Sequence, residues 1–228
     1  MIKLKKLKKL KKLKFNNNHD FIKLFENKIS NFTGAPYVVL TDSCTNAIFL
    51  SLYYKIHFTN YFPEILEIPE RTYISIKHTL ELLGIRYKIV KNKWNEFYEL
   101  KDSGIYDYAV GFDKNIYIEN TFQCLSFQQK KCLDIGKGGA ILLDNEKAYK
   151  LLNRLAWDGR DASIPVKKDK NIITGFHMNM TPEQAAIGIL KLNQLDSSRI
   201  KDFKGSYKNY PKINKKNKKN KENNYEGS

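Results

Sequence analysis

The sequence is poor in the residues that build disulfide scaffolds and metal sites. It contains only three cysteines, Cys44, Cys124 and Cys132, and four histidines in 228 residues. An odd number of cysteines without a C-x-x-C pair argues against a disulfide framework, and the scattered histidines argue against a zinc site. We therefore expect no bound metal and a reducing, cytoplasmic environment.

Long apolar runs are also absent. No stretch approaches the roughly 18 apolar residues of a membrane-spanning helix. The first residues lack the apolar core and the small-residue cleavage site of a secretory signal. Neither a transmembrane helix nor secretion is predicted.

Acidic residues are scarce only at the two ends. Residues 1–14 hold eight lysines and no acid, and residues 201–228 hold nine lysines and three acids. Residues 15–200 keep 23 basic and 21 acidic residues, a net charge of +2 out of +16 for the chain. Because nucleic-acid-binding domains carry their charge on the folded surface, we expect no specific nucleic-acid partner.

The basic ends have low complexity. In MIKLKKLKKLKKLKF a leucine recurs every third residue, so at about 100° per residue the leucines wind around a helix instead of forming one stripe. We interpret residues 1–19 as a disordered leader, with an anchor to anionic membranes as the alternative. Residues 201–228 are interpreted as a disordered tail that buries no apolar face. Residues 20–200 are expected to form the folded domain.

Within that domain the pattern alternates between helix and strand. Helices are predicted from Asp20 as N-cap to Gly34, from about Thr45, over 73–83, near 146–157, and from Thr181, whose Pro182 and Gln184 complete a capping box. Strands are predicted at Tyr37–Thr41, 65–69, 85–90 and 139–144. This alternation predicts an α/β fold with a mostly parallel sheet and helices on both faces.

The segment TDSCTNAIFL places polar residues between a strand and a helix. Free N–H groups of Cys44 and Thr45 at a helix start would bind an anion, with the Thr45 hydroxyl as a further donor. The alternative is an ordinary helix cap formed by Ser43 or Thr45.

The segment QCLSFQQKKCLDIGKGGAILLD places Lys130 and Lys131 between two apolar strands, before a glycine-rich turn. A loop in this position can hold a lysine inside the protein, where desolvation lowers its pKa and lets it attack a carbonyl to form a Schiff base. The alternative is a solvated lysine pair.

The spacing S-F-x-x-x-K-x-L, followed by G-x-G-G and a strand, resembles the cofactor-lysine loop of the DegT-type (DegT/DnrJ/StrS) sugar aminotransferases. These are pyridoxal-phosphate (PLP) enzymes of the aspartate-aminotransferase fold. The segments TDSCTNA, IPERTYIS and GFHMNMTPEQAAIGILKL resemble three further motifs of the family in the same order. The resemblance implies the PLP-transferase large domain, with the C-terminal small domain largely absent.

The resemblance also implies residue roles. Lys131 matches the catalytic lysine that holds PLP. Ser126, Thr45 and the backbone of Cys44 match phosphate ligands, and Tyr73 matches the aromatic residue that stacks on the cofactor.

The family further requires an acid that keeps the pyridine nitrogen protonated. Asp107, in IYDYAVGF, is our preferred residue because only a carboxylate holds that proton. Asn120, in YIENTFQ, is the competing position.

His177 stands where the family has an asparagine that reaches the phosphate of the partner subunit, which implies a homodimer. A structural loop histidine is the alternative. Two further positions depart from the family: Val110 stands where a glutamine or histidine usually bonds the phenolic oxygen of the cofactor, and Asn179 stands where an arginine is common.

The implied activity is transfer of an amino group, with glutamate as the expected donor, to a nucleotide-linked keto sugar in polysaccharide or amino-sugar synthesis. Related dehydratases carry histidine at the lysine position, so Lys131 favours transamination. The rival hypothesis is a non-catalytic remnant of the fold, held weakly on anionic membranes by its basic ends.

Overall fold

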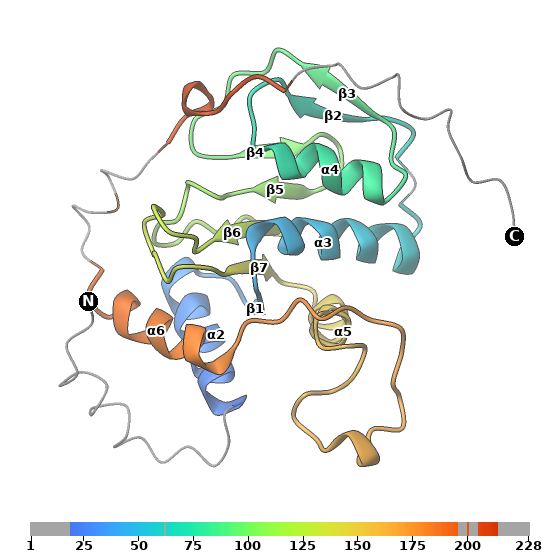
Figure 1. Ribbon diagram of the computed structural model, residues 1–228, viewed down its shortest axis with the longest axis vertical. Helices are drawn as coiled ribbons and strands as arrows, with labels where there is room; N and C mark the ends of the chain where they lie inside the picture. Colours follow the sequence, from blue (N-terminus) through green and yellow to red (C-terminus); the bar gives the residue numbers. More distant parts are fainter. Residues whose placement is uncertain (1–18, 62, 196–199, 201–204, 214–228) are drawn as a thin grey trace, which may run out of the picture.

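A computed structural model describes residues 19–61, 63–195, 200 and 205–213 of this protein (Figure 1). Its centre is a five-stranded sheet in the order β1-β7-β6-β5-β4, and a two-stranded sheet, β2-β3, lies beyond β4. The strands are β1 (Tyr37–Thr41), β2 (Leu66–Pro69), β3 (Tyr87–Val90), β4 (Tyr98–Leu100), β5 (Ile105–Asp107), β6 (Phe122–Ser126) and β7 (Gly139–Leu143). The helices are α2 (His19–Thr33), α3 (Cys44–Phe58), α4 (Ile74–Leu82), α5 (Glu146–Ala156) and α6 (Pro182–Leu192).

The sheet is mixed, which corrects the expectation of a mostly parallel one. Only the pair β5–β6 of the five-stranded sheet is parallel, whereas β1–β7, β6–β7 and β4–β5 are antiparallel. For β4 and β5 the physical reason is the length of their connection. Four residues, 101–104, join β4 to β5, and a parallel neighbour would need a crossover of about a dozen residues or more.

Helices cover both faces of the sheet, as predicted. One apolar cluster joins α3, α4 and α5 to the face that carries Val39 and Ile141. The other joins α2 and α6 to the opposite face, which carries Leu40 and Leu142. Neighbouring residues of β1 and β7 therefore enter different clusters, as the two-residue period of a strand requires. The helices and strands expected between 37 and 192 are present, with ends shifted by one or two residues.

The helix starts follow local sequence. Thr181 caps α6, its side chain accepting from the Gln184 N–H while the Gln184 side chain accepts from the Thr181 N–H, so the predicted capping box is present. Asp20 is not an N-cap, because α2 already includes His19. The buried face of α2 includes the carboxylate Glu26 beside Phe25 and Ile29.

The expectation of a disordered tail from residue 201 is wrong for Gly205–Ile213, which we call the C-terminal segment. In Figure 1 this segment, in red, runs beside the β2–β3 end of the sheet. Ile213 is buried, and its N–H donates to the Glu70 carbonyl at 2.7 Å. Burial of Ile213 and this backbone hydrogen bond contribute to anchoring the segment despite its polar composition. Residues 1–18 of the leader and residues 214–228 lie outside the described part of the chain, whereas His19 belongs to α2.

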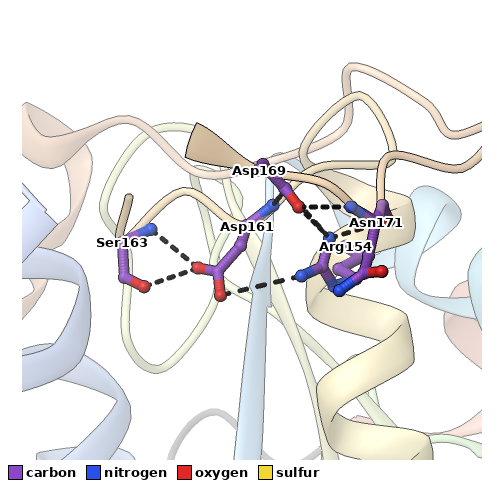
Figure 2. Close-up of polar contacts among 5 residues, drawn as sticks. All are labelled: Arg154, Asp161, Ser163, Asp169 and Asn171. Carbon is purple, nitrogen blue, oxygen red and sulfur yellow. Dashed lines mark hydrogen bonds and ion pairs between the residues drawn. The ribbon is translucent and has the colours of Figure 1, made fainter. Parts of the chain in front are cut away.

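A long loop between α5 and α6 is held by a carboxylate (Figure 2). Asp169 accepts from Nη1 of Arg154 at 2.9 Å and from the N–H groups of Asp161 and Asn171. These backbone donors hold the pKa of Asp169 below its usual value. Nη2 of Arg154 also lies 3.9 Å from Oδ2 of Asp161, so one guanidinium on α5 contacts the loop at two positions, Asp161 and Asp169.

Over the described residues, no helix is long and apolar enough to span a bilayer.

Candidate active site

A cavity of about 410 Å³ opens at the sheet edge where β1, β5 and β6 end. These strands run in the same direction, because β1 and β6 are both antiparallel to β7 and β5 is parallel to β6. Their carboxyl ends therefore meet at one edge, which is the usual ligand site of α/β proteins. Six of the seven predicted site residues line this cavity: Cys44, Thr45, Tyr73, Asp107, Ser126 and Lys131.

The first turn of α3 forms one wall. Ser43 caps the helix, its hydroxyl accepting from the Asn46 N–H at 3.2 Å. The N–H groups of Cys44 and Thr45 follow, where a helix has no internal acceptors to offer. The turn lies directly on Gly139, since a Cβ built there would be 2.4 Å from the Ser43 carbonyl carbon. The last glycine of G-x-G-G is thus required by close backbone approach.

Two helix starts point into the cavity together. The Thr45 hydroxyl of α3 and the Ser75 hydroxyl of α4 are 2.8 Å apart. Ser126, at the end of β6, lines the same cavity. Hydroxyls and helix N-termini are typical ligands of a phosphate.

Lys131 lies in the loop between β6 and β7. Two backbone hydrogen bonds join the arms of the loop: the Phe127 N–H donates to the Gly138 carbonyl, and the Gln129 N–H donates to the Gly136 carbonyl. Lys131 lines the cavity, whereas Lys130 is exposed with a left-handed φ of 73°. Burial lowers the pKa of Lys131, opposed by the negative charge of Asp107. The loop therefore places Lys131 in the cavity and its neighbour Lys130 on the surface.

Asp107 ends β5 and is buried. Its Oδ1 accepts from the Ala109 N–H and its Oδ2 from the Tyr98 hydroxyl, both at 2.9 Å. Tyr98 in turn shares a short hydrogen bond with the Thr72 hydroxyl. Burial raises the pKa of Asp107, against the effect of these donors and of Lys131. The carboxyl group is thus fixed in direction and destabilised as an isolated charge, so it favours a cationic partner.

Cys44 and Tyr73 differ in exposure. Burial raises the pKa of the Cys44 thiol, which keeps it protonated, and its Sγ lies 3.4 Å from the Cys124 carbonyl oxygen. Tyr73 is 53% exposed and precedes α4, so its ring lies at the cavity edge.

The structure does not bring His177 to this cavity. Its Nδ1 lies 3.0 Å from Asp158, and its side chain is 81% exposed. Asn120, the competing position for the acid, is also outside the cavity and donates its N–H to Asp144.

Sequence reasoning missed three residues of the site. Ser75 lies within the IPERTYIS motif and could have been found there. Tyr98 and Tyr210 had no signal, because no strand was predicted at Tyr98 and Tyr210 lies in a segment that was interpreted as a disordered tail.

Residues 113–206 match the sequence model of the DegT/DnrJ/EryC1/StrS aminotransferase family. Among solved structures, the chain is similar to the sugar aminotransferase CalS13 from Micromonospora echinospora, with 14% identity and a TM-score of 0.64 over 77% of this chain and 61% of that one. It is similar to NtdA from Bacillus subtilis with bound PMP, with 21% identity and a TM-score of 0.60 over 77% and 48% of the two chains. It is also similar to the GDP-4-keto-6-deoxy-D-mannose-3-dehydratase of E. coli with hydrated PLP, with 16% identity and a TM-score of 0.61 over 77% and 60%.

These comparisons confirm the resemblance and the predicted PLP-transferase fold, although its sheet is mixed instead of mostly parallel. The chain spans about three fifths or less of the length of these three structures. No curated protein sequence matches it.

Proposed function

We propose that this protein is a PLP-dependent aminotransferase. The observation that carries the proposal is a single cavity lined by the amine of Lys131, the carboxylate of Asp107 and the start of α3. This set of groups matches the three ends of PLP: an aldehyde, a pyridine nitrogen and a phosphate.

The residues present fit that group. The N–H groups of Cys44 and Thr45, with the hydroxyls of Thr45, Ser75 and Ser126, would hold its phosphate. Tyr73, at the cavity edge, offers a flat aromatic face to the ring.

Lys131 and Asp107 would carry the chemistry. Bound PLP supplies an electron sink for the substrate carbon. Nζ of Lys131 would first hold the cofactor and then move the proton between the amino donor and the cofactor, and its lowered pKa favours the neutral amine that this role needs. Oδ1 and Oδ2 of Asp107, oriented by Ala109 and Tyr98, would keep a proton on the ring nitrogen.

The finer assignments rest on the family resemblance. We propose glutamate as donor and a nucleotide-linked keto sugar as acceptor, and the Lys131 amine favours transamination over the dehydratase chemistry named for one similar structure. A homodimer would explain why His177 is exposed and outside the cavity of its own chain. Cytoplasmic location and a role in polysaccharide or amino-sugar synthesis stay predictions.

The direct test is covalent capture. PLP is added to the purified protein, the product is reduced with borohydride, and its peptides are mapped. We expect the label on Lys131, with Lys131→Ala as the unlabelled variant and Lys130→Ala as the matched control that keeps it. A label on Lys130, or no label, contradicts the proposal, and no uptake of PLP favours the non-catalytic remnant.

A further inference from the structure

The C-terminal segment is fastened to the chain next to the cavity. Nη1 of Arg71 donates to the Tyr210 carbonyl at 2.8 Å, and the Ile213 N–H donates to the Glu70 carbonyl at 2.7 Å. Lys212 forms an ion pair with Glu70 at 3.3 Å. Residues 70 and 71 directly follow β2 and lead to Tyr73. These contacts use the carbonyl of Tyr210, the side chain of Lys212 and the N–H of Ile213, so they do not depend on the Tyr210 side chain.

Trp94 fixes the other side of the segment. Its carbonyl accepts from the Tyr207 N–H at 3.2 Å, and its indole Nε1 donates to the Arg71 carbonyl at 2.9 Å. The rings of Trp94 and Tyr210 pack at 5.3 Å between centroids. Tyr210 is thus held from its backbone and from one side of its ring.

The Tyr210 side chain reaches Lys131. Nζ of Lys131 donates to the Tyr210 hydroxyl at 3.3 Å and lies 5.9 Å from the centre of its ring. Tyr210 also lines the cavity. Burial, followed by the charge of Asp107, raises the pKa of Tyr210, so the hydroxyl stays protonated and neutral at ordinary pH.

A lysine side chain has four rotatable bonds, and an acceptor at its end selects one direction for the amine. We propose that Tyr210 is a positioning residue for Lys131: its hydroxyl orients the Lys131 amine, and its ring covers that amine from solvent. The proposal rests on the proposed function for the use made of the amine, but the contact itself can be tested without PLP.

The first measurement is lysine acetylation by acetic anhydride in the protein without added PLP, followed by mass spectrometry. The rate at Lys131 is divided by the rate at Lys137 of the same loop, whose side chain is 63% exposed. Tyr210→Ala should raise this ratio several-fold because the covering ring is gone. Tyr210→Phe should restore it to near the wild-type value.

The second measurement is the affinity for PLP, followed by absorbance. Tyr210→Phe should weaken binding by about three- to tenfold, the size expected for one neutral hydrogen bond. Tyr207→Phe is the matched control, because Tyr207 lies in the same segment but outside the cavity, and it should change neither measurement.

The outcomes separate the two proposals. Faster labelling of Lys131 in Tyr210→Ala without PLP uptake by the wild type would refute the proposed function and support the covering role of Tyr210. PLP uptake with unchanged labelling in Tyr210→Ala would overturn the covering role, and equal affinities of wild type and Tyr210→Phe would overturn the role of the hydroxyl.

Discussion

Gly139→Ala tests whether the glycine-rich turn supports the start of α3. Gly139 begins β7 and pairs with Thr41 of β1 and Ser126 of β6, so sheet hydrogen bonds fix its position. A Cβ there would lie 2.4 Å from the Ser43 carbonyl carbon and 2.6 Å from the Cys44 nitrogen. These are backbone atoms of a capped helix start and cannot rotate away.

The expected loss of stability follows from this overlap. Ordinary contacts begin at 3.4 Å, so the first turn of α3 must move by about 1 Å. Overpacking of this kind costs about 1–3 kcal/mol, and backbone atoms favour the upper end. Alanine recovers about 0.5–1 kcal/mol over glycine in a strand, which leaves a net loss of about 2 kcal/mol. For a chain of this size we expect a melting temperature lower by about 4–8 °C.

The assay combines thermal unfolding with PLP titration. Gly139→Ala should also weaken PLP binding, because the moved turn carries the N–H groups of Cys44 and Thr45. Gly84→Ala is the control: its φ is +67° but no atom lies within 4 Å of the added Cβ, so it should cost about 1–2 kcal/mol and leave PLP affinity unchanged. Wild-type stability and affinity in Gly139→Ala would refute the close approach.

Four further results are expected. Asp107→Asn should keep the fold and strongly reduce turnover, whereas Asn120→Ala should change turnover little; the reverse order in a kinetic assay would show that the wrong acid was chosen. Ending the chain after residue 204 should lower the melting temperature by several degrees relative to ending it after residue 213, because the buried Ile213 is lost; equal values would contradict its packing. Sedimentation should show a dimer, and His177→Asp should lower its affinity for PLP. A monomer with full PLP uptake would exclude the shared site. Asp169→Asn should lower the melting temperature at pH 7. The difference from wild type should shrink as the pH falls through the lowered pKa of Asp169, below 3.8, because only the ionised carboxylate stabilises the loop. A difference in melting temperature that does not change with pH would refute this role of the carboxylate.

Local features were readable from the sequence. Thr181, Pro182 and Gln184 specify the start of α6 through contacts within four residues. The two apolar strands around the lysines determine that their connecting loop lies at a sheet edge. The resemblance of this loop to the DegT-type motif implied that Lys131, five positions after Ser126, is the cofactor lysine, and Lys131 lines the cavity. Contiguous residues encode these features, so the sequence alone determined them.

The tertiary structure decided what depends on distant segments. The sheet is mixed because the short connection 101–104 reverses the chain between β4 and β5, and because β7 pairs antiparallel with both β1 and β6. The pattern of apolar residues records neither pairing. Tyr98 reaches Asp107 through the β4–β5 hairpin, and Tyr210 reaches Lys131 across 79 positions. His177 was expected near the cofactor of a partner, and only the fold shows that it lies away from the cavity of its own chain. Such contacts form when packing brings separate segments together, and residue types and spacing along the chain carry no direct mark of them.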